Sequence, residues 1–349
     1  MGFFVTNHQS PGLKFGLSIV ICTYNGVDRL YKVLEHINKL IIPSKLVFEV
    51  LIVDNASSDG TSNWVRKTFE TSDWKFAPVI LSENKPGLNF ARLTGARNAR
   101  FEWILFCDDD NLLDSQYLYY WHNTINTFLD VGAVGGCGIP LLEIPAPKWF
   151  NRYKNSYAVG SQHDKTGYLK HGGSLYGAGM FILKTPVLGI LDRGFNMVMS
   201  DRNAGNLSSG GDLEWCYLLQ LSGWKLYYNE KMVFQHQIAA SRLTWSYYIK
   251  LKSGIASGAA LLFTYQFMFK YGNKKFHSFL LIYLHQTIKA LFVYFYVSKK
   301  LNLFFRSSST HENDLSLSIL KSKAKSYFNY FNEANIHFKK LKRFFSDAV

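Results

Sequence analysis

The sequence predicts an α/β fold with a mainly parallel, Rossmann-like central sheet covered by helices, followed by a helical C-terminal extension. Three observations lead to this prediction. Apolar runs of strand length alternate with segments of helical periodicity in the N-terminal third of the chain. Four of those apolar runs end in polar residues. From Trp245 onward the composition becomes aromatic and basic, in segments with a helical pattern.

The alternation of strands and helices is clearest at the start. Residues 17–25, "LSIVICTYN", form the continuous apolar run of a strand buried on both faces. Residues 26–41 then place apolar side chains at helical spacing. Because this alternation repeats, we expect a parallel sheet with helical crossovers. The further strands are expected at 48–55, 77–84 and 101–110, and the further helices at 61–70 and 88–100.

The pattern becomes irregular after Asp110. A helix is expected over 114–130, strands over 131–140, 176–184 and 225–237, and a loop-rich segment over 141–172. Another helix is predicted to open at Asp212 and to close near Gly223. We therefore divide the chain into an N-terminal extension (1–15), a catalytic-type domain (16–240) and a helical C-terminal region (241–349).

The C-terminal region contains a long apolar segment, Phe279–Val297, with Lys289 near its centre. A membrane-spanning helix needs about 20 mostly apolar residues, and a central lysine is costly there. We therefore expect a helix that packs on the domain or lies in a membrane interface rather than one that spans. Ser307–Ser316 is expected to be a loop.

Composition limits the classes of protein that this chain can be. At 349 residues, 48% hydrophobic and 18% charged, it can bury a large core. Of the net charge of +14, +12 lies from Trp245 to the end, where 16 Lys/Arg face 4 Asp/Glu; such a tail favours an anionic partner. The four cysteines form no CxxC pair, and the N-terminus has no secretory pattern, so we expect reduced thiols in the cytoplasm.

The polar strand ends are the candidate site. In an open parallel sheet, ligands bind beyond the carboxyl ends of the strands. The polar clusters at 23–25, 54–61, 83–84 and 108–110 should therefore meet along one edge. No G-x-G-x-x-G fingerprint follows the first strand and no P-loop is present, which argues against a dehydrogenase or a P-loop nucleotidase.

Five segments in order, "VICTYN", "LIVDNASSDGT", "ENKPGLNFARLTGARNA", "FCDDDN" and "GGDLEW", resemble the inverting family 2 glycosyltransferases of GT-A fold. The resemblance covers roughly residues 16–240. It implies a nucleotide-sugar donor and a divalent cation, Mn²⁺ or Mg²⁺. Each residue role below is what the resemblance implies, and the alternative reading is given beside it.

The nucleotide is expected at the first strand ends. The resemblance implies that Asp54 accepts an N–H of the base and that Thr23, Tyr24 and Asn25 line the same pocket. The alternative for Asp54 is a turn, because "DNASSDGT" is rich in loop formers.

The "N-x-G…AR" segment supplies Asn84, Gly87 and Arg92, with the arginine near the diphosphate. The alternative is an ordinary helix start with a solvated arginine.

The "DDD" segment matches the family's D-x-D motif. Asp110 is assigned to the metal and Asp108 to ribose and metal, since i and i+2 share a face of an extended segment. Asp109 is expected to point elsewhere, toward the sugar or solvent, and His236 is a candidate metal ligand. The alternative is an acidic loop. Without a cation the three carboxylates are expected to be mutually strained.

The general base is expected at the start of the last helix of the domain. Asp212 in "GGDLEW" would take the proton of the acceptor hydroxyl. Gly211 replaces the acidic neighbour that is usual in the family, and Glu214 is the alternative base. The other reading of Asp212 is a helix N-cap.

Together these observations predict an enzyme that transfers a sugar from a nucleoside-diphosphate sugar, UDP-linked, to a glycan or lipid-linked acceptor with inversion. The basic tail suggests peripheral membrane contact at the inner face of the cell membrane. Two alternatives stay open: a nucleotidyltransferase acting on sugar phosphates, and a non-catalytic protein that binds nucleic acid through the tail. Because the tail's long apolar helix suits packing or a membrane better, no nucleic-acid partner is expected.

Overall fold

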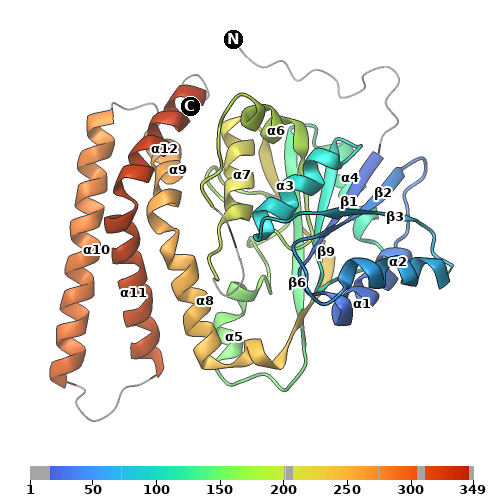
Figure 1. The fold of residues 1–349 in the computed structure, drawn as a ribbon. Helices are drawn as coiled ribbons and strands as arrows, with labels where there is room; N and C mark the ends of the chain where they lie inside the picture. Colours follow the sequence, from blue (N-terminus) through green and yellow to red (C-terminus); the bar gives the residue numbers. More distant parts are fainter. Residues whose placement is uncertain are drawn as a thin grey trace.

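A computed structural model describes residues 16–71, 73–199, 201, 207–272, 276–304 and 311–345. Helices flank a central sheet, and a layer of long helices from the C-terminal part stands beside it (Figure 1). The predicted α/β fold class with a helical extension is confirmed. The predicted N-terminal extension, 1–15, lies outside the described residues.

The strands of the described residues form one sheet of mixed direction, in the order β3-β2-β1-β4-β8-β6-β9-β5, with β7 paired to β9. The half that the sequence describes most clearly, β3-β2-β1-β4, is parallel. In the other half β8 runs antiparallel to β4 and β6, whereas β6 and β9 are parallel. The irregular pattern after Asp110 therefore reflects a real change of topology.

The first half of the sheet follows the predicted elements closely. Every residue of β1 is buried, as expected for a strand with helices on both faces. Helix α1 buries Leu30, Val33, Leu34 and Ile37. The bounds here are β1 Gly16–Thr23, α1 Val27–Asn38, β2 Val47–Asp54, α2 Thr61–Thr71, β3 Pro78–Ser82, α3 Leu88–Asn98, β4 Trp103–Asp108, β5 Asn111–Leu113 and α4 Tyr117–Thr127.

The second half contains one helix that the sequence reading did not predict, α6. The segment 141–172, expected to be loop-rich, holds only short elements. The bounds are β6 Val131–Leu142, α5 Phe150–Tyr153, η1 Lys154–Tyr157, β7 Gly167–Tyr168, β8 Met180–Leu183, α6 Lys184–Asp192, α7 Gly211–Leu221 and β9 Lys225–Ile238.

The C-terminal part is helical, as predicted. Its elements are η2 Ala240–Leu243, α8 Trp245–Ser257, α9 Ala259–Tyr271, α10 Phe276–Phe304, α11 His311–Asn329 and α12 Phe331–Phe344. The loop expected at Ser307–Ser316 is wrong for 311–316, which begin α11; residues 307–310 lie outside the described residues.

The helical part packs firmly on the rest of the chain. The Tyr265 hydroxyl of α9 donates to a carboxylate oxygen of Glu214 in α7 at 2.7 Å. The ring of Phe195 lies 5.5 Å from that of His337 in α12. The domain boundary at residues 240–241 stays a prediction.

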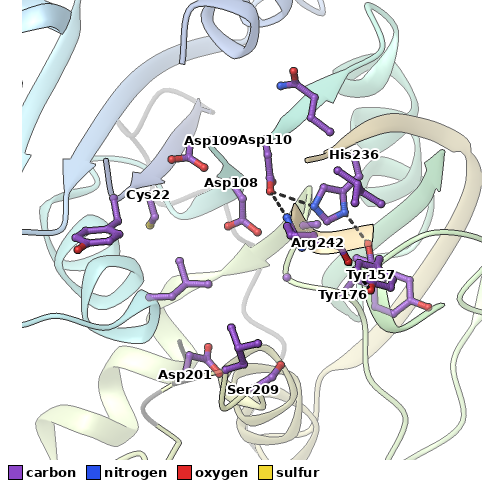
Figure 2. A pocket seen from close by; sticks show the side chains of 18 of the residues that line it. Cys22, Asp108, Asp109, Asp110, Tyr157, Tyr176, Asp201, Ser209, His236 and Arg242 are labelled. Carbon is purple, nitrogen blue, oxygen red and sulfur yellow. Dashed lines mark hydrogen bonds and ion pairs between the residues drawn. The ribbon is translucent and has the colours of Figure 1, made fainter. Parts of the chain in front are cut away.

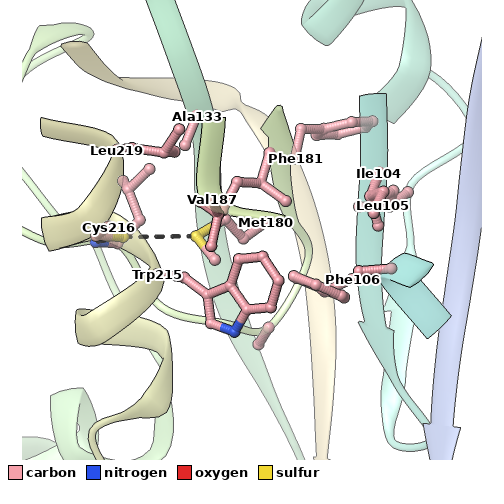
Figure 3. Close-up of a cluster of buried hydrophobic side chains, with 14 of the residues drawn as sticks. Ile104, Leu105, Phe106, Ala133, Met180, Phe181, Val187, Trp215, Cys216 and Leu219 are labelled. Atoms are coloured by element: carbon pink, nitrogen blue, oxygen red, sulfur yellow. Dashed lines mark hydrogen bonds between the residues drawn. The ribbon is translucent and has the colours of Figure 1, made fainter. Parts of the chain in front are cut away.

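A core of large side chains joins α7 to the sheet (Figure 3). Trp215 is fully buried, and its ring centre lies 5.3 Å from that of Phe106 on β4. Its indole N–H donates to Asn89 of α3 at 2.9 Å. This core therefore fixes α3, β4 and α7 relative to one another, and all three carry candidate site residues.

Helix α3 approaches β1 so closely that only glycine fits at one position. A Cβ added to Gly95 would lie 2.3 Å from a methyl carbon of the buried Val20. Gly189 in α6 is also helical, but a Cβ there would meet nothing within 4 Å.

We therefore predict opposite effects for two glycine-to-alanine substitutions. Gly95→Ala should lower the free energy of unfolding by roughly 1–3 kcal/mol, because the core is overpacked. Gly189→Ala should raise it by about 1 kcal/mol, because alanine favours a helix. Denaturant unfolding measures both. Equal changes in the two variants would contradict the close packing of α3 on β1.

Candidate functional site

A cavity of about 1040 Å³ lies beyond the carboxyl ends of β1 and β4 (Figure 2). Strand register explains why the polar strand ends meet there. Thr23 at the end of β1 pairs with Asp54 of β2, and Cys22 pairs with Asp108 of β4. The far wall comes from α7 and from the segments around 176–178 and 207–209.

Most of the predicted site residues line this cavity. They are Thr23, Tyr24, Gly87, Arg92, Asp108, Asp109, Asp110, Asp212 and His236. The fold therefore brings together side chains that are up to 213 residues apart, counting from Thr23 to His236. Asn25, Asp54, Asn84 and Glu214 are not among the lining residues.

Each carboxylate of the "DDD" segment is paired with its own arginine. Asp108 Oδ1 accepts from Arg92 at 3.1 Å, and Asp109 Oδ2 accepts from Arg29 at 2.8 Å. The third pair joins Asp110 Oδ2 to Arg242 at 2.9 Å. Three guanidinium groups therefore offset much of the expected mutual strain. Part of it remains, because burial and the nearby Asp110 raise the pKa of Asp109 above its ordinary value, against the opposing effect of Arg29.

The assumed alternation of an extended strand also fails here. Strand β4 ends at Asp108, and Asp109 and Asp110 form a turn before β5 begins at Asn111. The three side chains therefore fan out toward different partners instead of alternating between two faces (Figure 2). Asp109 is not solvated: Thr23 Oγ1 donates to it at 2.7 Å.

Asp110 and His236 are held as a pair by strand pairing. Asn111 of β5 lies opposite His236 of β9 in an antiparallel ladder. His236 Nδ1 is 2.6 Å from the carbonyl oxygen of Tyr157, which can only accept, so Nδ1 carries a proton. In the neutral ring, Nε2 then presents a lone pair to Asp110 Oδ2, 3.2 Å away.

Two lone pairs at this distance call for a proton or a cation between or beside them. An imidazole whose other N–H donates to a backbone carbonyl is the usual arrangement of a metal-binding histidine. Asp110 and His236 thus fit a divalent cation. Within the described residues no group of three or more His, Cys, Asp or Glu side chains is arranged to hold a metal.

Arg92 lies at the centre of the site. It is 3% exposed and contacts both Asp108 and, at 3.9 Å, Asp201. Burial alone would lower the pKa of Arg92, but the carboxylates of Asp108, Asp201 and Asp212 raise it above its ordinary value. Its guanidinium lies against Gly177, where an added Cβ would come within 2.5 Å of a guanidinium nitrogen. Arg92 therefore stays charged and closely held.

Asp212 is the second residue of α7 and lines the cavity. Its Oδ2 accepts from the backbone N–H of Gly177 at 3.1 Å, and its Oδ1 accepts from that of Leu213 at 2.9 Å. The N-cap residue of α7 is Gly210, and no side chain caps the helix, so Asp212 is not the N-cap.

The absent acidic neighbour of Asp212 has a spatial substitute, Asp201. Its Oδ1 accepts from the backbone N–H groups of Gly210 and Gly211 at 2.8 and 2.6 Å. A Cβ on Gly211 would lie 2.2 Å from Asp201 Oδ2, so glycine makes room for this carboxylate. Burial and the nearby Asp212 raise the pKa of Asp201 to about 6, against the opposing effect of Arg92.

Glu214, the alternative base, is in the core rather than at the cavity. Its two oxygens accept from the backbone N–H groups of Val198 and Met199 at 2.8 and 2.9 Å, and Oε1 also accepts from Tyr265. Burial raises the pKa of Glu214 to about 7, opposed by these hydrogen bonds. Of the two candidates, Asp212 is the one with access to a ligand in the cavity.

Asp54 and Asn25, predicted to line the base pocket, both bond residues of the 57–62 segment in this structure. Asp54 accepts from Ser57 N and Ser62 Oγ at 3.1 and 2.5 Å, and Asn25 Oδ1 accepts from Ser58 N at 2.8 Å. The turn reading of Asp54 therefore matches its contacts. Its role toward a base stays a prediction.

Asn84 is exposed. The side chain that holds the 83–87 turn in place is that of Asn55. Asn55 is buried and lines the cavity. Its amide donates to the carbonyls of Glu83 and Lys85, and its oxygen accepts from Gly87 N at 2.8 Å. It thereby fixes the start of α3, which carries Arg92.

The residues that sequence reasoning missed are Arg29, Asn55, Asp201 and Arg242. Asn55 carries no local signal for its role, because the backbone groups that it bonds are 28 to 32 residues away. The two arginines carry no local signal, since their acidic partners are 80 and 132 residues away. Asp201 has none either, because its N–H donors lie in another element.

Known proteins resemble this chain in sequence and in fold. Residues 18–180 match the model of glycosyl transferase family 2. This region of the chain is therefore similar to the members of that family. The match includes Arg92 and the "DDD" triad of the glycosyltransferase region, and it ends before Asp212.

Among curated relatives, the poly-beta-1,6-N-acetyl-D-glucosamine synthase of Staphylococcus aureus is 28% identical over 121 residues, covering 35% of this chain and 28% of that protein. This chain thus spans just over a quarter of the length of that relative. Among solved structures, TarS from S. aureus aligns with a TM-score of 0.51 at 13% identity, covering 95% and 90% of the two chains. The mannosyltransferase PcManGT from Pyrobaculum calidifontis, in complex with GDP-Man and Mn²⁺, aligns with a TM-score of 0.52 at 18% identity, covering 95% and 87%. The two structures share the GT-A fold with this chain.

We predict that Glu214→Gln removes a pH dependence of stability. The pKa of Glu214 in the folded protein, about 7, lies above its ordinary value of 4.5, so its stabilising contribution is complete below 4.5 and is lost as pH rises through about 7. Across that range the wild-type free energy of unfolding should fall by roughly 3 kcal/mol relative to the variant. Denaturant unfolding at several pH values measures this.

The test depends on the slope with pH, because glutamine also loses a hydrogen-bond acceptor and shifts stability at every pH. The exposed Glu70→Gln is the control and should follow wild type throughout. Parallel curves for wild type and Glu214→Gln would show that Glu214 does not titrate between those values.

Proposed function

We propose that this chain is a metal-dependent, inverting glycosyltransferase that uses a nucleoside-diphosphate sugar, UDP-linked, and transfers its sugar to a hydroxyl of a glycan or lipid-linked glycan. One observation carries the proposal: a carboxylate-and-arginine cluster and the separate carboxylate Asp212 face one cavity at the carboxyl ends of the sheet. The similarity of residues 18–180 to the members of a glycosyltransferase family supports it.

The donor diphosphate is assigned to the arginine side. Arg29, Arg92 and Arg242 each hold one carboxylate, and all three line the cavity. A diphosphate is a stronger partner for a guanidinium than a carboxylate, since it offers more oxygens and more charge. On donor binding these arginines can contact phosphate and the released carboxylates can contact ribose or cation.

Asp110 and His236 would hold the cation, Mn²⁺ or Mg²⁺, with phosphate oxygens completing its coordination. A cation held by these two residues would supply positive charge to stabilise the diphosphate leaving group. TarS has been solved in complex with UDP, with a TM-score of 0.50 to this chain, and PcManGT with GDP-Man and Mn²⁺. Donors of this chemistry are therefore compatible with the fold.

Asp212 is proposed as the general base. Its Oδ2 takes the proton of the acceptor hydroxyl while that oxygen attacks C1 of the sugar. The new C1–O bond forms as the bond from C1 to the phosphate oxygen breaks, and the nucleoside diphosphate leaves from the opposite face. Backbone N–H groups of Gly177 and Leu213 hold the carboxylate in place for this step.

The remaining assignments are proposals of the same kind. Thr23, Tyr24, Asn25 and Asp54 would bind the nucleoside, with Asp54 released from its loop contacts. The reaction is placed in the cytoplasm, at the inner face of the cell membrane, and the reason for the membrane is argued from α10 below.

We predict that Asp212→Asn lowers transfer by roughly 10²–10⁴-fold, the usual contribution of general base catalysis, while donor binding persists. Asp110→Asn should instead weaken Mn²⁺-dependent donor binding. A screen of nucleotide-sugars for Mn²⁺-dependent thermal stabilisation identifies the donor, and product release in its presence measures turnover. Asp192→Asn, on the exposed Arg97 ion pair, is the matched control and should behave as wild type.

The identity of the released product separates this proposal from its alternative. A transferase releases a nucleoside diphosphate, whereas a nucleotidyltransferase acting on a sugar phosphate releases pyrophosphate. Full activity of Asp212→Asn, or release of pyrophosphate, would contradict the proposed reaction.

A further inference from the structure

The outward face of α10 is an exposed apolar stripe. Its members recur every three or four residues and so lie on one side of the helix. Leu281 is 70% exposed, Ile288 57% and Phe292 67%. The stripe consists of Leu281, Leu284, Ile288, Phe292, Phe295 and Tyr296.

The opposite face of α10 already satisfies the packing needs of the helix. Phe279 and Tyr283 are fully buried. The Phe279 ring stacks on that of Phe338 in α12 with centroids 4.1 Å apart, and the Tyr283 hydroxyl donates to the carbonyl of Tyr327 in α11. The stripe is therefore not needed to pack α10 on the rest of the chain. An exposed apolar patch of this kind marks a surface that binds a partner or a membrane.

Helix α10 lies at the outer edge of the helical layer, on the side farthest from the sheet (Figure 1). From His277 to Lys299 its exposed face runs about 33 Å at 1.5 Å per residue. Within the described residues α10 is the helix long and apolar enough to cross a membrane: an 18-residue window inside Phe276–Lys299 has a mean hydropathy of 1.4.

The charges beside the stripe are positive. Helix α10 contains no acidic residue, and the exposed His285 and Lys289 flank the stripe on one side. A groove of about 270 Å³ between α9, α10 and α11 adds Lys270 and Lys323. An apolar stripe flanked by cationic groups matches the interfacial region of a bilayer, whose surface is anionic and whose interior is apolar.

We propose that α10 lies flat on an anionic lipid bilayer, with the stripe inserted among the lipids and the lysines at the headgroups. Packing of Phe279 and Tyr283 against α11 and α12, together with Lys289 near the middle of the helix, favours this placement over a spanning helix surrounded by lipid. A second copy of the chain fits less well, because a symmetric pairing would bring the basic flanks together. The proposal rests on the proposed location but not on the transfer reaction.

Vesicle flotation of the full chain tests the proposal. With vesicles of phosphatidylcholine and phosphatidylglycerol in equal parts, wild type should float, and it should float less with phosphatidylcholine alone. Leu281→Glu should weaken binding to the mixed vesicles roughly tenfold or more, since it removes an inserted apolar group and adds a like charge. Phe292→Glu is a second variant with the same expectation.

Leu129→Glu is the matched control. Leu129 is 65% exposed, close to the 70% of Leu281, but it lies between α4 and β6 in the other part of the chain. It should bind vesicles like wild type. Thermal unfolding should confirm that all three variants remain folded.

Three outcomes would overturn the proposal. The first is failure of wild type to bind the mixed vesicles, and the second is a loss of binding in the control as large as that of Leu281→Glu. The third is a dimer, seen by sedimentation without lipid, that Leu281→Glu dissociates; it would assign the stripe to a second copy. None of these outcomes bears on release of a nucleoside diphosphate, so the proposed reaction is tested separately.

Discussion

The pairing of three adjacent carboxylates with three arginines is the interaction on which the site depends. Asp108, Asp109 and Asp110 would repel one another at the end of a buried strand. Arg92 of α3, Arg29 of α1 and Arg242 of η2 each hold one of them. Because the three arginines come from α1, α3 and η2, these ion pairs also hold the three elements in position around the cavity.

Much of the fold could be predicted from the sequence, because the signals were local. The runs "LSIVICTYN" and "FEWILF" are buried strands for a reason visible in the chain itself, namely continuous apolar residues ended by polar ones. The antiparallel insertion of β8 next to β4 could not be predicted that way, because it depends on which strand edges are left open after β1–β4 assemble. Helix α6 was missed because "KTPVLGILD" has an early proline and no acidic first turn.

The site, like the fold, could be predicted from the sequence only in part. Its location at the strand ends follows from the general geometry of parallel sheets, and nine predicted residues line the cavity. The individual roles depend on partners that are distant in sequence. Asn84 and Asn55 illustrate this: both lie in polar segments, but only the backbone path of the 83–87 turn makes Asn55 the residue that bonds it. Asp212 and Glu214 are likewise only two residues apart. Because they lie on different sides of α7, Asp212 lines the cavity and Glu214 lies in the core.

The pairing of β5 with β9 has a consequence for the order in which the protein is made and folded. Asp110 meets His236 and Arg242 across 126 and 132 residues of chain. During synthesis the "DDD" turn therefore leaves the ribosome well before two of its partners exist. Contacts of such long sequence separation form late, because the entropy of closing the loop is lost before the contact is gained. Completion of the cavity is thus tied to the synthesis of β9 and η2, and a partly synthesised chain holds an acidic turn that lacks this histidine and this arginine.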